Sequence, residues 1–113
     1  MARAERLPNG LTLLLERLPY APVAAVVLAY RTGSRNETEG TRGLSHFCEH
    51  MVFKGTPSIP RSRLWQIVER DGGIANAFTT RDMTAYFSML PASRLEDALR
   101  IESDRMVNCI LDP

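Results

Sequence analysis

The chain has 113 residues, of which 44% are hydrophobic and 24% are charged, and its formal net charge is +1. This length suits one domain and is too short for two, and the composition is that of an ordinary globular protein. A net charge this close to zero makes no case for a nucleic-acid partner, and two cysteines far apart in sequence do not make a disulfide framework.

The first part of the chain predicts three strands. Asn9-Gly10 stands between two extended stretches, residues 4–7 and 11–17, and this dipeptide is a strong hairpin signal. Residues 23–31 are rich in β-branched side chains and almost wholly apolar, which predicts a strand covered on both faces. Residues 32–42 are polar and contain glycine, so we expect a loop whose charges are solvated.

Residues 43–54 predict a helix that carries both histidines of the chain. Neither Pro nor Gly interrupts this stretch after its first residue, and Gly55 stands where a C-cap glycine would. Its many apolar residues predict a largely buried helix. His46 and His50 are four residues apart and therefore share one face, at a spacing that lets two imidazoles reach one metal ion.

Glu49 completes the pattern H-x-x-E-H, which reverses the H-E-x-x-H motif of zinc proteases. It lies beside the histidine pair, where it can contact a water on the metal without being forced to act as a ligand. Zinc lowers the pKa of such a water to roughly 7, and a nearby carboxylate can then take its proton. The pattern therefore predicts Zn²⁺ as cofactor, although two histidines at this spacing also fit an ordinary surface or core pair. Cys48 is about 200° around the helix from both histidines and is expected to be a small buried thiol.

The second half of the chain predicts a helix, a hairpin and a helix. Ser62 is a suitable N-cap for a helix to about residue 70, and residues 74–80 and 83–90 predict two strands joined by a tight turn. Ser93 to Glu96 fits a capping box for a helix to about residue 108. The apolar stripe of the first helix consists of Leu64, Trp65, Ile67 and Val68; Leu95, Ala98, Leu99, Glu102 and Met106 are spaced along the second. This order predicts an α+β fold in which helices pack on one face of a mostly antiparallel sheet.

The two ends of the chain carry different signals. The N-terminal residues lack an apolar signal core, and the longest apolar run, residues 23–30, is too short to span a bilayer. We therefore expect a cytoplasmic location and no membrane span. Asp112-Pro113 is typical of the opening of a helix, so we expect the chain to be a part of a longer polypeptide.

Five stretches carry a family signature. They are residues 33–37, 43–56, 72–80, 84–87 and 102–106, which read GSRNE, GLSHFCEHMVFKGT, GGIANAFTT, TAYF and ESDRM. Together they resemble the pitrilysin/insulinase family of zinc metallopeptidases, especially its mitochondrial-processing-peptidase-like branch. A lone H-x-x-E-H is a weak signal, whereas the same motif followed by M-x-F-K-G-T and then by G-G-x-x-N-A-F-T-T is a strong one.

The resemblance implies roles for five residues. His46 and His50 would be zinc ligands, and Glu49 would be the general base on the zinc-bound water. Asn76 and Ala77 would lie in a strand that borders the active site, where a substrate peptide adds as an extra strand. On its sequence alone, Asn76 also fits a turn or bulge.

The resemblance also implies what this chain lacks. The family takes its third zinc ligand from a glutamate on a later helix, and no position up to Pro113 can be assigned to it. Glu96 and Glu102 are interpreted instead as capping and solvated charges. Residues 1–113 would form the N-terminal part of a single peptidase domain, without the third-ligand helix and the second homologous domain or subunit.

The function expected from this resemblance is zinc-dependent endopeptidase activity on extended or unfolded polypeptides. The isolated chain is expected to bind zinc weakly and to lack useful activity. One alternative is a non-catalytic assembly subunit of the same fold, and another is an unrelated binding domain with a chance motif. The intact set of His46, Glu49 and His50 argues against a scaffold, which has no need for all three.

Overall fold

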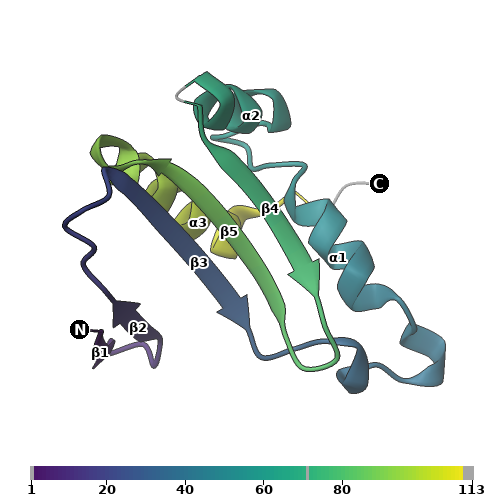
Figure 1. Ribbon diagram of the computed structural model, residues 1–113. Helices are drawn as coiled ribbons and strands as arrows, with labels where there is room; N and C mark the ends of the chain where they lie inside the picture. The colour runs from purple at the N-terminus through teal and green to yellow at the C-terminus, as the bar shows by residue number, and fades with distance from the viewer. Residues whose placement is uncertain (1, 71, 111–113) are drawn as a thin grey trace.

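The computed structural model describes residues 2–70 and 72–110. Within them the chain forms an α+β fold with two small antiparallel sheets, which confirms the predicted class (Figure 1). The helix-start signature at residues 112–113 lies outside the described residues. The elements are β1 (Arg3–Arg6), β2 (Thr12–Leu15), β3 (Val23–Tyr30), α1 (Leu44–Val52), α2 (Arg61–Arg70), β4 (Ile74–Thr79), β5 (Thr84–Pro91) and α3 (Leu95–Asn108), with short 3-10 turns at Ser34–Asn36, Glu39–Thr41 and Ala92–Arg94.

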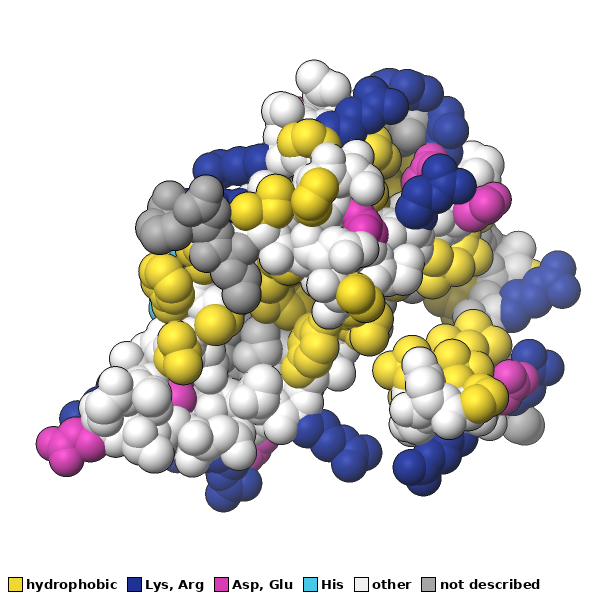
Figure 2. All heavy atoms as spheres, turned by 180° about the vertical axis from the view of Figure 1, so that it is seen from behind, with side chains coloured by type: hydrophobic (Ala, Val, Ile, Leu, Met, Phe, Trp, Pro, Cys, Tyr) yellow, Lys and Arg dark blue, Asp and Glu magenta, His cyan; other side chains and the backbone are white. Residues whose placement is uncertain are grey.

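The predicted N-terminal hairpin, β1–β2, is confirmed. The amide of Gly10 donates to the carbonyl of Leu7 at 2.9 Å, and the Leu7 amide donates to the carbonyl of Leu11 at 2.8 Å. Gly10 has a φ of 91°, which is the left-handed position of a three-residue hairpin loop. The hairpin lies apart from the central sheet, and its Leu14 is 72% exposed (Figures 1 and 2).

The central sheet has the strand order β3-β5-β4, and both pairings are antiparallel. Helix α3 lies behind it in the view of Figure 1. Along β3 the side chains alternate between half-buried and exposed, and Val27 is 63% exposed. The prediction that this strand is covered on both faces is therefore wrong, because the described helices cover only one face and β3 lies at the edge of the sheet.

Helices α2 and α3 each contribute a residue to both clusters of the core. One cluster joins Leu64 to Ile101 and Ile59, and another joins Val68 to Leu90 and Ala98. Leu64 and Val68 are almost fully buried, which confirms the predicted apolar stripe of α2.

The start and the buried face of α3 differ from the prediction. The helix begins after a 3-10 turn that follows β5 directly, so Arg94 takes the N-cap position. Its side chain makes no capping hydrogen bond to the first turn of the helix. The predicted capping box from Ser93 to Glu96 is therefore wrong. The side chains that α3 buries are Ala98, Ile101, Glu102 and Arg105, whereas Leu95, Leu99 and Met106 are exposed.

Gly55 redirects the chain after α1. It has a φ of 92°, and a Cβ placed on it would lie 2.4 Å from the carbonyl oxygen of Ile59. Because an L-residue is strained at this φ and backbone atoms cannot move aside, we expect Gly55→Ala to lower the free energy of unfolding by about 1–3 kcal/mol in urea titration. Gly40→Ala is the control, since a Cβ there meets nothing within 4 Å. Equal stability of the two variants would contradict this explanation.

Candidate metal centre

The N-terminus of α1 is held by a carboxylate from the preceding loop. Glu37 accepts hydrogen bonds from the amides of Gly43 at 2.8 Å and Ser45 at 2.9 Å. These amides have no partner inside the helix, so a carboxylate there completes their hydrogen bonding and complements the helix dipole. The prediction that the charges of residues 32–42 are only solvated is therefore wrong for Glu37.

The same loop is hydrogen-bonded to the tip of the β4–β5 hairpin. The amide of Ser34 donates to the carbonyl of Thr80 at 3.1 Å, and that of Arg35 to the carbonyl of Arg81 at 3.0 Å. Gly33 permits this approach, because a Cβ on it would lie 2.3 Å from the Thr80 oxygen. The hairpin tip, the loop and α1 are thus connected by these backbone hydrogen bonds and by the Glu37 carboxylate, which set the position of the helix against β4.

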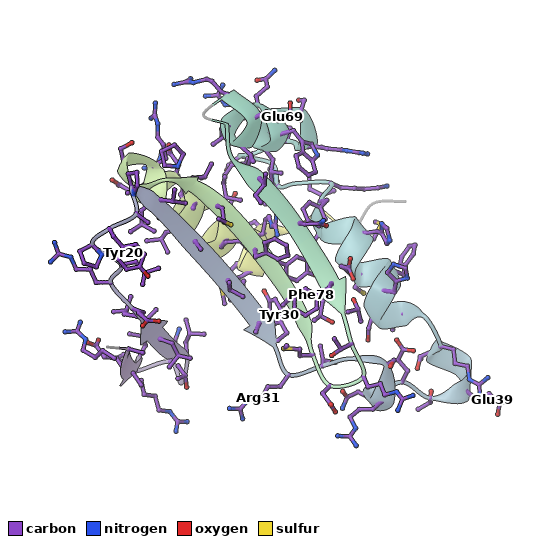
Figure 3. The ribbon with its side chains drawn as sticks, in the orientation of Figure 1. Tyr20, Tyr30, Arg31, Glu39, Glu69 and Phe78 are labelled. Carbon is purple, nitrogen blue, oxygen red and sulfur yellow. The ribbon has the colours of Figure 1, made fainter. Side chains whose placement is uncertain are left out.

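Glu37 makes a pH-dependent contribution to stability. The amides of Ser45 and Gly43 hold the pKa of its carboxyl below the ordinary glutamate value. Its contribution is therefore fully present above the unfolded-state pKa of about 4.3 and is lost as pH falls through the lower folded-state pKa. We expect Glu37→Gln to flatten the decline in unfolding free energy below about pH 5. Glu39→Gln, at the outer end of the loop in Figure 3, should leave the decline unchanged.

The histidine pair converges as the i, i+4 spacing predicts. Helix α1 begins one residue and ends two residues inside the predicted range, and the Nε2 atoms of His46 and His50 are 2.9 Å apart. One ligand atom from each of His46, Glu49 and His50 lies within 4.8 Å of the others. Two imidazole nitrogens on a tetrahedral zinc are about 3.4 Å apart, given Zn–N bonds of about 2.0–2.1 Å. The two rings therefore need only a small separation to fit one Zn²⁺, and their donor atoms are of the type that zinc prefers.

The side chains of α1 differ in their exposure to solvent. Glu49 and Met51 are buried, whereas both histidines and Cys48 are exposed, and Phe47 is 58% exposed. The predictions of a largely buried helix and of a buried thiol are therefore wrong, because α1 lies beside the edge of the sheet rather than over its face. Cys48 does face away from the histidines and lines a separate apolar pocket with Tyr30.

Strand β4 borders this centre. It pairs only with β5 among the described residues, so its other edge is open, and it packs beside α1. Asn76 lines the same pocket of about 360 Å³ as Glu49 and His50. The Asn76 side chain also accepts a hydrogen bond from the amide of Ala77 at 2.8 Å. The structure thus brings Asn76 and Ala77 to the histidine helix.

A buried ion pair lies near the centre and was missed by the sequence analysis. Arg105 is 3.5 Å from Glu102, and both side chains are at least nine-tenths buried. The guanidinium carbon lies 4.9 Å from the ring centroid of Phe53 and 5.2 Å from that of Tyr86. Burial raises the pKa of Glu102, and Arg105 opposes this shift. The interpretation of Glu102 as a solvated charge is therefore wrong; its i, i+3 spacing from an arginine was the available signal.

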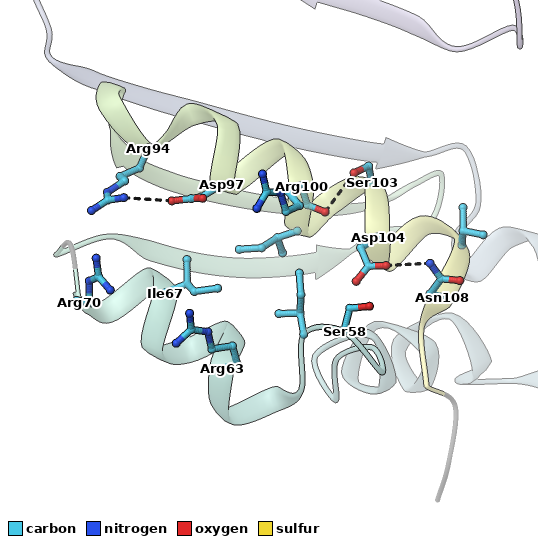
Figure 4. A pocket seen from close by; sticks show the side chains of 13 residues that line it. Ser58, Arg63, Ile67, Arg70, Arg94, Asp97, Arg100, Ser103, Asp104 and Asn108 are labelled. Carbon is cyan, nitrogen blue, oxygen red and sulfur yellow. Dashed lines mark hydrogen bonds and ion pairs between the residues drawn. The ribbon is translucent and has the colours of Figure 1, made fainter.

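A hollow larger than the pocket beside the histidines lies elsewhere. A cavity of about 840 Å³ opens between α2 and α3, and arginines surround it (Figure 4). Arg94 pairs there with Asp97 at 3.6 Å. Neither histidine lines this cavity, so it is separate from the candidate metal centre.

Both the sequence and the structure of the chain are similar to those of known proteins. The sequence model described as insulinase, peptidase family M16, matches residues 12–113. The chain is 40% identical over 108 residues to the mitochondrial-processing peptidase subunit beta of Blastocladiella emersonii, which covers 96% of this chain and 23% of that protein. It is 37% identical over 103 residues to an uncharacterized zinc protease of Rickettsia bellii, which covers 91% of this chain and 25% of that protein.

A solved structure agrees with the sequence relatives. The crystal structure of a protease from Helicobacter pylori superposes with a TM-score of 0.93 at 33% sequence identity, covering 99% of this chain and 27% of that one. The chain thus spans about a quarter of the length of the proteins it matches. Among the described residues no helix is both long and apolar enough to span a membrane.

Proposed function

The chain belongs to the insulinase family of peptidases, family M16, and on this premise we propose that it carries the zinc-binding half of a metalloendopeptidase centre. The observation that supports the proposal most directly is the convergence of His46, Glu49 and His50 on one side of α1, next to an open strand edge. Relatives that are named zinc proteases support zinc as the metal.

Each of the three residues has a distinct part in the proposed chemistry. His46 and His50 would hold the metal through ring nitrogens. A bound zinc supplies a Lewis acid and lowers the pKa of water to roughly 7. Glu49 takes the proton from the attacking water, and its burial keeps bulk water from competing for the carboxylate.

A third protein ligand is required. Catalytic zinc sites generally use three protein ligands and keep one position open. Within the described residues the cluster contains only His46, His50 and Glu49, and the last is the proposed base. We therefore place the third ligand outside the described residues, in a longer polypeptide in which residues 1–113 form the N-terminal part of the peptidase domain.

The proposed substrate is an extended polypeptide that adds to the edge of β4. The Ala77 amide is held by the side chain of Asn76, and the rotation of this side chain would release the amide to a substrate carbonyl.

We expect N-methylation of single backbone amides near the scissile bond of a peptide to raise KM by about tenfold, at alternate positions only, because alternate amides face the neighbouring strand. Steady-state cleavage of a methylation series measures this, and a uniform effect at every position would contradict strand addition.

A non-catalytic assembly subunit is the second candidate, because several relatives are named as subunits of a peptidase. Peptide cleavage by the full-length gene product, before and after chelation and zinc re-addition, separates the two functions. The proposal expects cleavage that is lost on chelation and restored by zinc, with zinc bound in calorimetric titration. Absence of cleavage would favour the assembly subunit, and absence of zinc binding would overturn the proposed metal centre.

A further inference from the structure

Thr79 contacts the carboxylate of the proposed base from another element. It is the last residue of β4, and its hydroxyl donates a hydrogen bond to Oε2 of Glu49, thirty residues away in sequence. Glu49 is 9% exposed and the bond is part-buried, so it is shielded from much of the solvent, and a hydrogen bond to a charged group is stronger than one between neutral groups.

A glutamate carboxylate needs such a partner to hold one orientation. The terminal torsion of a glutamate side chain is broad, so burial alone does not orient its two oxygens. Thr79 occupies Oε2 and leaves Oε1 as the oxygen that can face the histidine side. General-base catalysis depends on the carboxylate lying within hydrogen-bond reach of the proton it removes, so this orientation affects the rate directly.

The position of Thr79 is itself well defined. Thr79 pairs with Thr84 across the hairpin, and the Thr80 amide donates to the carbonyl of Met83 at 2.8 Å. The hairpin tip is bound in turn to Ser34 and Arg35 of the loop that holds α1. Thr79 and Glu49 therefore lie on two elements that are linked by the backbone hydrogen bonds of Ser34 and Arg35 to the hairpin tip and by the Glu37 carboxylate at the start of α1.

We propose that Thr79 is a positioning residue that orients Glu49 through its hydroxyl; this rests on the proposed function of Glu49 as general base. Thr79→Val keeps the shape of the side chain and removes the donor, whereas Thr79→Ser keeps the donor. Thr80→Val is the matched control, because among the described residues the Thr80 hydroxyl bonds only within its own turn, to Asp82 and Met83, and not to Glu49.

The first test is steady-state cleavage by the full-length gene product, with zinc affinity measured in parallel. Thr79→Val should lower kcat by about 10- to 100-fold, the loss expected for one hydrogen bond to a charged group, with KM and zinc affinity within about threefold. Thr79→Ser should restore kcat to within about threefold of the wild type, and Thr80→Val should keep it. An unchanged kcat in Thr79→Val, or a parallel loss of zinc, would overturn the positioning role while leaving the proposed function intact.

The second test does not depend on activity. In metal-free protein, Thr79→Val should lower the thermal midpoint by several degrees in the wild-type background and by less than half as much in a Glu49→Met background. Equal shifts in both backgrounds would show that the two side chains are not coupled. An inactive wild type would overturn the proposed function, and the thermal comparison would still decide whether Thr79 acts on Glu49.

Discussion

Replacement of Glu49 by Gln in the full-length gene product is expected to reduce kcat by about 10²- to 10⁴-fold while zinc affinity changes little. A glutamine has nearly the same shape and its amide oxygen can still accept the hydrogen bond from Thr79, so the site keeps its geometry. It cannot take a proton from water, which is the role proposed for this residue. Steady-state cleavage and zinc calorimetry on the same preparation measure the two quantities.

The histidine variants provide the contrast. His46→Ala and His50→Ala each remove a proposed ligand, so both zinc binding and cleavage should be lost together. The zinc affinity should fall by more than the 10- to 100-fold typical of losing a residue that only supports a ligand. Substantial activity in Glu49→Gln, or tight zinc in either alanine variant, would show that the roles are distributed differently.

The largest expected effect on stability comes from Arg105. Its replacement by Ala leaves the Glu102 carboxylate buried without its cation and removes the guanidinium from between Phe53 and Tyr86. Removing one partner of a buried ion pair typically costs about 3–5 kcal/mol, because the remaining charge is desolvated and uncompensated. We expect Arg105→Ala to lower the free energy of unfolding by that amount in urea titration.

Two further variants test whether the loss of stability comes from the unpaired charge or from lost packing. Arg100→Ala removes an exposed arginine from the same helix and should change stability by less than about 0.5 kcal/mol. The double variant Arg105→Leu with Glu102→Met replaces the pair by apolar side chains and should recover most of the loss. If the double variant is as unstable as Arg105→Ala, lost packing rather than an unpaired charge explains the effect.

The features that could be predicted from the sequence are those set by short-range periodicity. The i, i+4 spacing of His46 and His50 places them on one helical face whatever surrounds the helix, and the structure shows this convergence. Asn9-Gly10 specifies a turn through the backbone preferences of two residues. The stripe of α2 was predicted for the same reason, since a helix turns through a fixed angle per residue.

The remaining features depend on which helices and strands pack against each other, and the local sequence pattern does not encode this packing. The burial of Glu102 and Arg105 follows from the packing of α3 behind the sheet, whereas Glu102 was interpreted from the sequence as a solvated charge. Cys48 and Phe47 looked like core residues by composition but are exposed, because α1 lies at the sheet edge.

The contacts that set the geometry of the candidate centre are long-range in the same sense. Glu37 accepts hydrogen bonds from amides six and eight residues ahead of it, at the start of α1, and Thr79 donates to Glu49 across thirty residues of sequence. The sequence by itself determined that two imidazoles and a carboxylate share one helix. Only the tertiary structure decided how that carboxylate is held, because a hydrogen bond between distant elements forms only after the strands and helices have packed.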